Sequence, residues 1–407
     1  MRHAIIKLAF ACVVLVAVLA PNPARAVDGV TGDTVTLGAF GPITGPAAYI
    51  GLGARDGMNI AVNEINAAGG VNGRKLRVLF EDDAHSPSRA LAAVKKLVDQ
   101  DKVFMILSLA GSNGTVGAID FVKQRQIPMY VSIASAPQVT RPFSKYLFRG
   151  GTTEAARYGE VFSEFLVTGL KARRIGIISS YDEYTKNEAD AVARHLKSWF
   201  NLEPVKRVQF NIADKDFTPQ LLELKESNPD AIFLSSHPAA GTIILRQARE
   251  LGLTQPFFGG GTMTDNSVPA NARSAAEGFT SGWLLPLYMG SKHPDMVKFE
   301  TAWRKEYPNM PTGRPNVFDL MGYGDAYVVA EGLKRAGRDL TVDKFIAALE
   351  GLRNYRVSMV ASVRTFSSEH HIGNLMLTVM QVKNGEWIPM DWEPKHPSDI
   401  LKDLKKQ

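Results

Sequence analysis

Cysteine is almost absent from this chain: Cys12 is the only one among 407 residues. It lies in an apolar run, residues 8–20, that follows two basic residues and precedes an Ala-Arg-Ala triplet at 24–26. This order is typical of a secretory signal with its cleavage site, and an uncleaved membrane anchor is the alternative. We therefore predict a signal peptide over residues 1–26 and a mature chain without a thiol, a disulfide or a cysteine-bound metal.

Long apolar runs and an excess of one charge are also lacking. No segment after the signal is apolar enough to span a bilayer. The formal net charge is only +6, and three of the basic residues belong to the signal segment. The remaining charges are well mixed, and the sequence has no tandem repeat or low-complexity segment. We expect an exported, periplasmic protein that is monomeric and binds no nucleic acid.

What the chain has is a regular alternation of short apolar runs and amphipathic stretches. Residues 35–40 form an apolar run that ends in the Gly/Pro-rich stretch 41–46. Apolar residues then recur at helical spacing between positions 54 and 65, and a second apolar run follows at 75–80. This order predicts a βαβ unit whose ligand edge lies at the carboxyl ends of the strands.

The same alternation continues along the chain and predicts an α/β fold with parallel sheets. About 380 mature residues are enough for two domains, and residues 147–152 look like a hinge between them. Further helices are expected near 299–307, 319–335 and 342–352, and strand-like segments near 360–364 and 375–383, before an Asn-Gly turn at 384–385.

A family resemblance rests on three segments in combination. They are Gly-Ala-Phe-Gly-Pro-Ile-Thr-Gly-Pro at 38–46, Glu-Ile-Asn-Ala-Ala-Gly-Gly-Val-Asn-Gly at 64–73 and Asp-Asp-Ala at 82–84. Together they resemble the start of the leucine/isoleucine/valine-binding protein family, the periplasmic solute-binding components of ABC importers. The resemblance extends over most of the mature chain.

This resemblance implies two Rossmann-like lobes with parallel sheets, joined by a three-strand hinge, and a ligand enclosed between them. It implies a membrane permease as partner, no cofactor and no chemistry performed on the ligand. On this basis we predict that residues 27–150 and 280–355 form the first lobe. Residues 151–279 and 356–407 are predicted to form the second.

Ser112 is the first candidate for ligand binding. It lies in a small-residue turn after a predicted strand, where the following helix offers free N–H groups to an anion. From the residues alone, Ser112 is equally well explained as a helix N-cap. The resemblance places Ser112 where a serine hydroxyl binds the ligand carboxylate. It places Ile133, Ala134 and Ser135 where backbone N–H groups and a second hydroxyl do so.

The resemblance also indicates the walls of the cleft. Tyr184 matches the cleft tyrosine of the second lobe, with an ordinary surface tyrosine as the alternative. Tyr49 and Ile50 cover the position of an aromatic wall residue, and which of them faces the cleft stays open. Phe318 is another wall candidate, although it fits core packing equally well. His237 occupies the position of a cleft tyrosine, and a structural loop histidine is the alternative.

One position departs from the family pattern. Amino-acid-binding relatives use a glutamate for the α-ammonium where this chain has Gly261, and Asp265 or Asp325 are the conceivable substitutes. Because a buried ammonium without a carboxylate is costly, we hypothesise a carboxylate ligand without an α-ammonium, such as an aromatic acid. A branched-chain amino acid is the family default. The cleft-side disulfide of the family is missing, with His85 and Gly111 at its two positions.

Two enzyme hypotheses are less favoured. Ser112 lies in a tight turn, and Asp325 and the pair His370-His371 come after it in the chain. This is the Ser, Asp, His order of an α/β-hydrolase, but no oxyanion-hole signature precedes the serine. The glycines at 51–57 have one residue too many for a dinucleotide fingerprint.

A metal site and a sensory role also stay open. Asp82, Asp83 and His85 could form a metal site, although adjacent carboxylates at a strand end are more often solvated. A sensory module would use the same fold and pass the closed-lobe signal to a partner other than a permease.

Overall fold

The computed structural model describes residues 27–310, 315–356, 358–400 and 402. The predicted signal peptide, residues 1–26, lies outside the described residues. Within these ranges, no helix combines the length and the apolar character that a membrane crossing requires.

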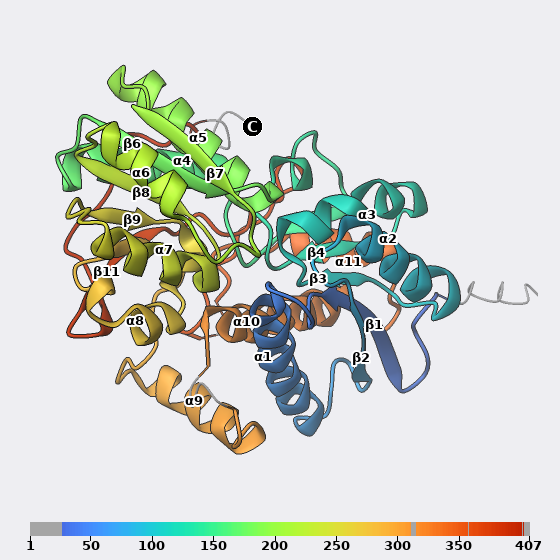
Figure 1. Cartoon of the computed structure of the whole chain (residues 1–407). Helices are drawn as coiled ribbons and strands as arrows, with labels where there is room; N and C mark the ends of the chain where they lie inside the picture. The colour runs from blue at the N-terminus through green and yellow to red at the C-terminus, as the bar shows by residue number, and fades with distance from the viewer. Residues whose placement is uncertain (1–26, 311–314, 357, 401, 403–407) are drawn as a thin grey trace, which may run out of the picture.

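The first sheet has five parallel strands in the order β2-β1-β3-β4-β5, as the alternation predicts. Their bounds are β1 (Thr34–Gly41), β2 (Lys75–Asp82), β3 (Ile106–Ser108), β4 (Met129–Val131) and β5 (Leu147–Arg149). The strands are connected by α1 (Ala48–Ala67), α2 (Pro87–Lys95) and α3 (Gly111–Arg125). In the register of the central strands, Leu107 of β3 is paired with Ala39 of β1 on one side and with Tyr130 of β4 on the other. This sheet and its helices form the first lobe (Figure 1).

The second sheet has seven strands in the order β12-β11-β10-β9-β8-β6-β7. Its parallel part comprises β6 (Ile175–Ser180), β7 (Lys206–Phe210), β8 (Ala231–Ser235), β9 (Phe257–Gly259) and β10 (Thr280–Trp283). The antiparallel edge is the hairpin of β11 (Thr378–Lys383) and β12 (Glu386–Pro389), which turns at the predicted Asn384-Gly385. The helices are α4 (Ala155–Glu164), α5 (Glu183–Phe200), α6 (Thr218–Glu226), α7 (Pro238–Glu250) and α8 (Ser267–Ala272).

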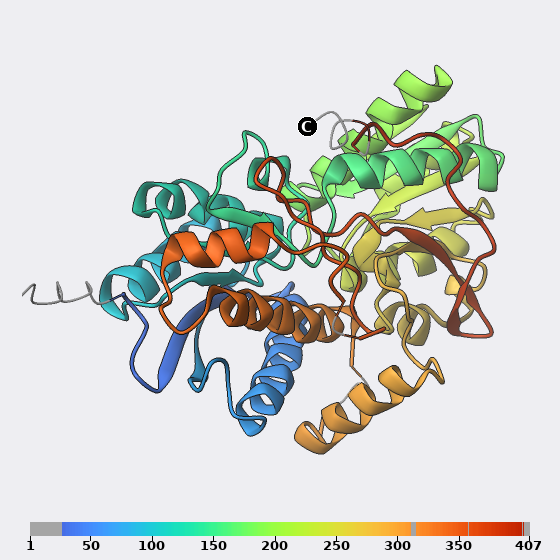
Figure 2. The same ribbon diagram turned by 180° about the vertical axis from the view of Figure 1, so that it is seen from behind.

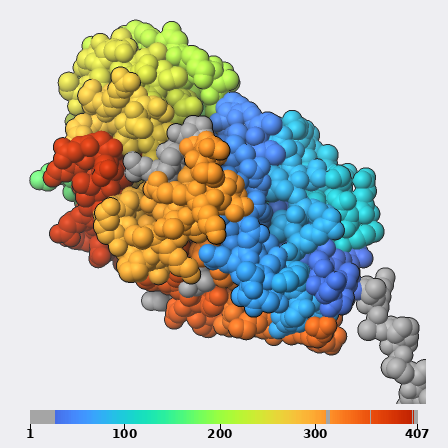
Figure 3. Space-filling model, turned by 90° about the horizontal axis from the view of Figure 1, so that it is seen from below, coloured from blue at the N-terminus to red at the C-terminus, as the bar shows by residue number. Residues whose placement is uncertain are grey.

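Three helices extend the first lobe after the chain leaves the second sheet. They are α9 (Pro294–Glu306), α10 (Val317–Ala336) and α11 (Val342–Glu350). The longest of them, α10, packs against α1 over much of its length. Seen from below, the surface around α9 lies between the second lobe in yellow and the first lobe in blue (Figure 3).

Short helical turns complete the secondary structure. Two π turns continue α2 and α4, at Lys96–Gln100 and Phe165–Gly169, and 3-10 turns occupy Pro137–Val139, Gly261–Thr264 and Arg273–Ala276.

Two predictions about the later part of the chain are wrong. The predicted lobe boundary assigns residues 280–283 to the first lobe, but β10 pairs with β9 and β11 in the second sheet. The predicted strand at 360–364 does not form, and Arg364 makes only an isolated bridge with Tyr355. Both errors have the same cause: an apolar run does not reveal which partner strand is available to it.

The three chain crossings between the lobes meet at one buried side chain. Asn374 donates hydrogen bonds to the carbonyl oxygens of Gly151, at 2.8 Å, and Leu284, at 3.3 Å. These residues lie on the first two crossings, and Asn374 itself lies on the third, which runs between the lobes in the view from behind (Figure 2). The crossings form the expected three-strand hinge.

A buried ion pair lies beside this hinge. Asp325 of α10 binds Arg364 at 2.8 Å, and both side chains are fully buried. The carboxylate also accepts hydrogen bonds from the hydroxyls of Tyr130 (2.9 Å) and Ser132 (2.5 Å). The charge of each partner is therefore compensated inside the protein.

Asp325→Ala should lower the free energy of unfolding by about 3–5 kcal/mol, because it leaves the Arg364 guanidinium buried without its counter-charge. Urea unfolding followed by circular dichroism measures this loss. Glu203→Ala breaks an exposed ion pair with Lys197 and should leave the urea midpoint nearly unchanged. Equal effects of the two substitutions would contradict the assignment of Asp325 and Arg364 as a stabilising buried ion pair.

Candidate functional site

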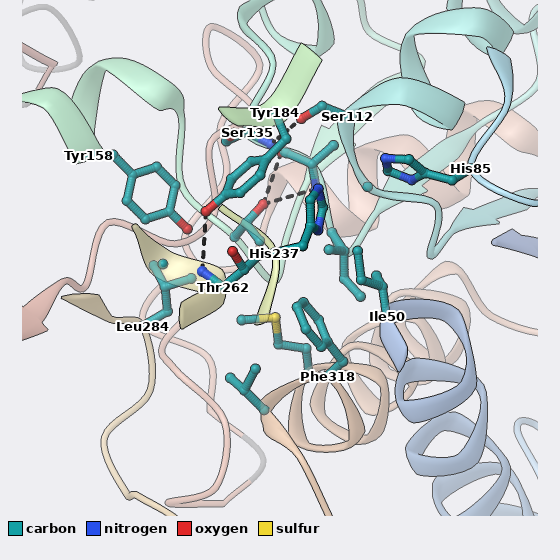
Figure 4. Close-up of a pocket in the computed structure, with 17 residues that line it drawn as sticks. Ile50, His85, Ser112, Ser135, Tyr158, Tyr184, His237, Thr262, Leu284 and Phe318 are labelled. Carbon is teal, nitrogen blue, oxygen red and sulfur yellow. Dashed lines mark hydrogen bonds between the residues drawn. The ribbon is translucent and has the colours of Figure 1, made fainter. Parts of the chain in front are cut away.

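The carboxyl ends of the two parallel sheets face each other across a cleft, and a pocket lies between them (Figure 4). The pocket encloses about 460 Å³ free of protein atoms, counted with the part open to solvent. Nine of the ten predicted site residues line it: Ile50, Ser112, Ile133, Ala134, Ser135, Tyr184, His237, Gly261 and Phe318. The rest of the lining was not predicted to contact the ligand: His85, Gly111, Thr152, Tyr158, Thr262, Leu284, Val317 and Met321.

Two serines form the polar end of the pocket. Ser112 does not cap α3, because its Oγ accepts hydrogen bonds from the backbone N–H groups of Ser135 and Ala136, each at 3.2 Å. The N-cap alternative is therefore wrong. The Ser135 Oγ is buried and has no hydrogen-bond partner among the described residues. Both hydroxyl hydrogens remain available to an acceptor in the pocket.

Arg149 holds the serine loop from behind. Its guanidinium is fully buried and donates to the carbonyl oxygens of Ala134 and Ala136, the latter at 2.7 Å. Burial lowers the pKa of Arg149 to about 10, so the group stays protonated at neutral pH. The loop is thus fixed by a buried cation, which no local sequence pattern indicated.

Glu188 organises the opposite wall. Its Oε1 accepts hydrogen bonds from the Tyr184 hydroxyl (2.9 Å) and the Gly261 N–H (3.0 Å), and its Oε2 accepts one from Ser235. Burial raises the pKa of Glu188 to about 7. Glu188 is absent from the predicted site, although its i,i+4 spacing from Tyr184 on α5 was a usable signal.

Gly261 leaves space that a neighbouring ring partly fills. A Cβ atom added at Gly261 would lie 3.0 Å from the nearest ring carbon of Tyr158. The Tyr158 side chain itself lines the pocket. A larger residue at position 261 would therefore require Tyr158 to move.

The structure places Ile50, and not Tyr49, on the pocket lining. The Tyr49 hydroxyl lies 2.9 Å from Nδ1 of His237 on the opposite lobe. The Tyr49 ring also packs edge-on against Phe318, with 5.6 Å between the ring centroids. Tyr49 therefore joins the lobes beside the pocket instead of forming its wall.

Among the described residues, the pocket lining contains no aspartate or glutamate. Asp265 is buried outside the lining, and its Oδ1 accepts a hydrogen bond from the N–H of Ser267. Asp325 is committed to Arg364 beside the hinge. Neither of the two conceivable substitutes for the missing glutamate reaches the pocket.

The structure does not bring together the residues of the hydrolase hypothesis. His371 is stacked on Phe148, with 3.7 Å between centroids, and its Nδ1 bonds to the carbonyl of Leu147. Asp325 is bound to Arg364, and Ser112 is bound to the loop at Ser135.

The glycines at 51–57 and the acidic pair at 82–83 have structural explanations. A Cβ atom at Gly57 would lie 1.8 Å from the carbonyl oxygen of Asp319, so this glycine permits close packing of α1 against α10. Asp82 accepts hydrogen bonds from the N–H groups of Ile43 and Ala84. It does not converge with Asp83 and His85 into a metal-binding group.

Comparisons with known proteins agree with this architecture. Residues 34–386 match the family model described as periplasmic binding protein. The leucine-, isoleucine-, valine-, threonine- and alanine-binding protein of Pseudomonas aeruginosa is 28% identical over 309 residues, which is 75% of this chain and 79% of that protein.

Two solved structures share the fold. The branched-chain amino acid transporter substrate binding protein LivJ of Streptococcus pneumoniae, in complex with isoleucine, superposes with a TM-score of 0.75 at 22% identity, covering 88% of this chain and all of that one. A solute binding protein of an ABC transporter from R. palustris, in complex with benzoate, has a TM-score of 0.76 at 18% identity, covering 88% and 95%. This chain belongs to the periplasmic binding protein family, among the solute-binding proteins of branched-chain amino acid-type ABC transporters.

Proposed function

We propose that this protein captures a small carboxylate that lacks an α-ammonium, such as an aromatic acid, and delivers it from the periplasm to the permease of an ABC importer. The observation that carries this proposal is the contrast between the two ends of the pocket. One end offers the Ser135 hydroxyl, which has no partner among the described residues, and the Ser112 hydroxyl, which accepts two hydrogen bonds but donates none. The described lining contains no acidic side chain.

The polar end suits a carboxylate. The Ser112 and Ser135 hydroxyls can both donate to the same anion, and hydrogen bonds to charged acceptors are stronger than neutral ones. The groups around them are already fixed by Arg149, so little ordering is needed when the ligand binds.

The opposite end does not suit an ammonium. Glu188 is the nearest buried acid behind Gly261, but its carboxylate already accepts three hydrogen bonds from Tyr184, Ser235 and Gly261. An ammonium would enter the pocket without a carboxylate partner, and the desolvation cost of an unpaired buried charge is several kcal/mol.

Apolar side chains cover the remaining wall, which suits a hydrocarbon or aromatic body. They are Ile50, Leu284, Val317, Phe318 and Met321. The fold is compatible with both ligand classes, because one structural neighbour holds isoleucine and another holds benzoate. The leucine-type amino acids remain the second candidate, because the curated relatives carry those names.

The mechanism that we propose is hinge closure. With β10 in the second sheet and the third crossing at Asn374, the lobes would comprise 27–150 with 284–373, and 151–283 with 375–400. Bonds between Tyr49 and His237 and between Asn113 and Glu183 join the lobes at the cleft. The ligand would enter an open form and complete these contacts on closing.

A ligand panel tests the proposal. After denaturation and refolding to remove any bound ligand, the protein should bind benzoate and related acids about 100-fold more tightly than leucine, isoleucine or valine. Isothermal titration calorimetry measures both affinities. Tight binding of leucine with no response to the acids would overturn the proposed ligand class and leave the family assignment intact.

Ser135→Ala should weaken binding of the acid by about 10- to 100-fold, because it removes a hydrogen bond to a charged group worth about 1.5–3 kcal/mol. Thr153→Val is the matched control: the Thr153 hydroxyl is also buried and unpartnered among the described residues but does not line the pocket. The same titration should show unchanged affinity for the control, and a similar loss in both variants would count against a carboxylate at Ser135.

Glu188→Gln should change the pH dependence of the free energy of unfolding more than it changes which ligand is preferred. Because the pKa of Glu188 is raised to about 7, its stabilising contribution is complete below its unfolded pKa and is lost as pH rises through 7. The free energy of unfolding should therefore fall less steeply in the variant between about pH 5 and pH 8. Urea unfolding across this range measures the slope.

Glu226→Gln, on the exposed side of α6, is the control and should retain the wild-type slope. Glu188→Gln should also keep the preference for acids over leucine. Loss of an existing leucine affinity in this variant would identify Glu188 as an ammonium partner instead.

A further inference from the structure

Three side chains that commonly bind metals converge at the mouth of the pocket. His85 lies in the loop between β2 and α2 of the first lobe, and Asp182 and His237 follow β6 and β8 of the second. One ligand atom from each of the three lies within 4.8 Å of the others. The two imidazole rings meet edge to face, with 5.6 Å between their centroids.

Three of the four histidine nitrogens of this cluster are buried and have no hydrogen-bond partner among the described residues. Neither Nδ1 nor Nε2 of His85 has a hydrogen-bond partner among the described residues. Nε2 of His237 lies 3.3 Å from Oδ2 of Asp182 but makes no hydrogen bond of acceptable geometry. Because buried polar atoms are normally satisfied, three unsatisfied nitrogens at one point indicate a site that binds a further group.

The surrounding groups hold the cluster in a state ready to bind a cation. Asp182 caps α5: its Oδ1 accepts hydrogen bonds from the N–H groups of Tyr184 and Thr185, and its Oδ2 accepts them from the hydroxyls of Ser180 and Thr185. A carboxylate oxygen and imidazole nitrogens are donors of the kind that bind Zn²⁺ in proteins.

Tyr49 supplies the supporting contact that metal-bound histidines usually have. Its hydroxyl lies 2.9 Å from Nδ1 of His237, which leaves Nε2 directed toward Asp182. Such partners fix the tautomer and orientation of the ligand ring.

We propose that His85, Asp182 and His237 form a binding site for a divalent transition metal of the Zn²⁺ class, spanning the two lobes. Zn²⁺ takes this set of nitrogen and oxygen ligands at about 2.0–2.2 Å, so the three side chains need to approach by roughly 1 Å. Both histidines also line the pocket, and the fourth coordination position therefore faces the ligand. A metal here would favour the closed arrangement of the lobes, whichever acid the pocket takes.

A second group of this kind does not carry the same inference. Glu160, His195 and Asp399 also lie within the same distance of one another. Glu160, however, already binds Arg157, Ser398 and the backbone of the C-terminal segment, and Nδ1 of His195 is bonded to the carbonyl of Ala191. This group provides a control.

The test uses the full exported protein purified without a polyhistidine tag and stripped of metal with a chelator. Titration calorimetry should detect one Zn²⁺ per chain. Co²⁺ should give the visible absorption bands of a low-symmetry, four-coordinate site. His85→Gln and His237→Gln should each weaken binding at least about tenfold, and Tyr49→Phe by about 10- to 100-fold.

His195→Gln should retain wild-type affinity and stoichiometry. Circular dichroism and thermal unfolding of each metal-free variant establish that it is folded. The proposal is overturned if Zn²⁺ does not saturate at millimolar concentration, or if the His85 variant binds it as tightly as wild type. The ligand titrations should be made with chelator present, so that neither result bears on the choice of acid.

Discussion

The site depends on one geometric constraint: two parallel sheets present their carboxyl ends to the same cleft. Ser112 follows β3 and Ser135 follows β4 in the first lobe, whereas Tyr184, His237 and Gly261 follow β6, β8 and β9 in the second. Because a parallel strand must end where its crossover begins, every such loop delivers its first residues to this edge. The position of the pocket is thus a consequence of topology, before any particular side chain is considered.

This constraint also explains which parts could be predicted from the sequence. Strands and helices were visible as local periodicities, and their order predicted that the ligand edge lies at the carboxyl ends of the strands. The individual ligand positions in the loops after the strands came mostly from the family resemblance. The tenth candidate, Tyr49, shows the limit: two adjacent residues were compatible with one wall position, and only the direction of α1 places Ile50 in the pocket. The sequence likewise did not reveal that β10 belongs to the second sheet, because its pairing partner β11 lies far along the chain.

The residues that were missed share a physical feature. Arg149, Tyr158 and Glu188 act through contacts between segments far apart in the chain, and two of them are charged groups buried where composition predicts apolar side chains. A buried charge is recognisable only when its partners are known, since the same residue unpaired would be destabilising. The i,i+4 spacing of Glu188 from Tyr184 was a local signal, but periodicity alone does not distinguish a solvated glutamate from one that anchors a wall.

These buried charges stay behind the lining and do not face the ligand. Arg149 fixes the serine loop and Glu188 fixes the tyrosine wall, so the pocket surface itself consists of hydroxyls, imidazoles, backbone and hydrocarbon. Such an arrangement pre-organises donors for an anion without placing a competing counter-ion in the site. For the proposed ligand class, selectivity would follow from the absence of an acidic side chain in the described lining as much as from the donors that are present.

Closure of the lobes is held by few direct contacts at the cleft. The bond between Tyr49 and His237 and the bond from the Glu183 N–H to Asn113 are each worth only about 1 kcal/mol net. A closed form stabilised so weakly can reopen, and a ligand shifts the balance by its differential affinity for the closed state. His237 participates in the pocket, in the contact with Tyr49 and in the cluster with Asp182 and His85. In the proposed mechanism, any group that orients this imidazole would therefore act on ligand binding and lobe closure together, and His237 would couple the two processes.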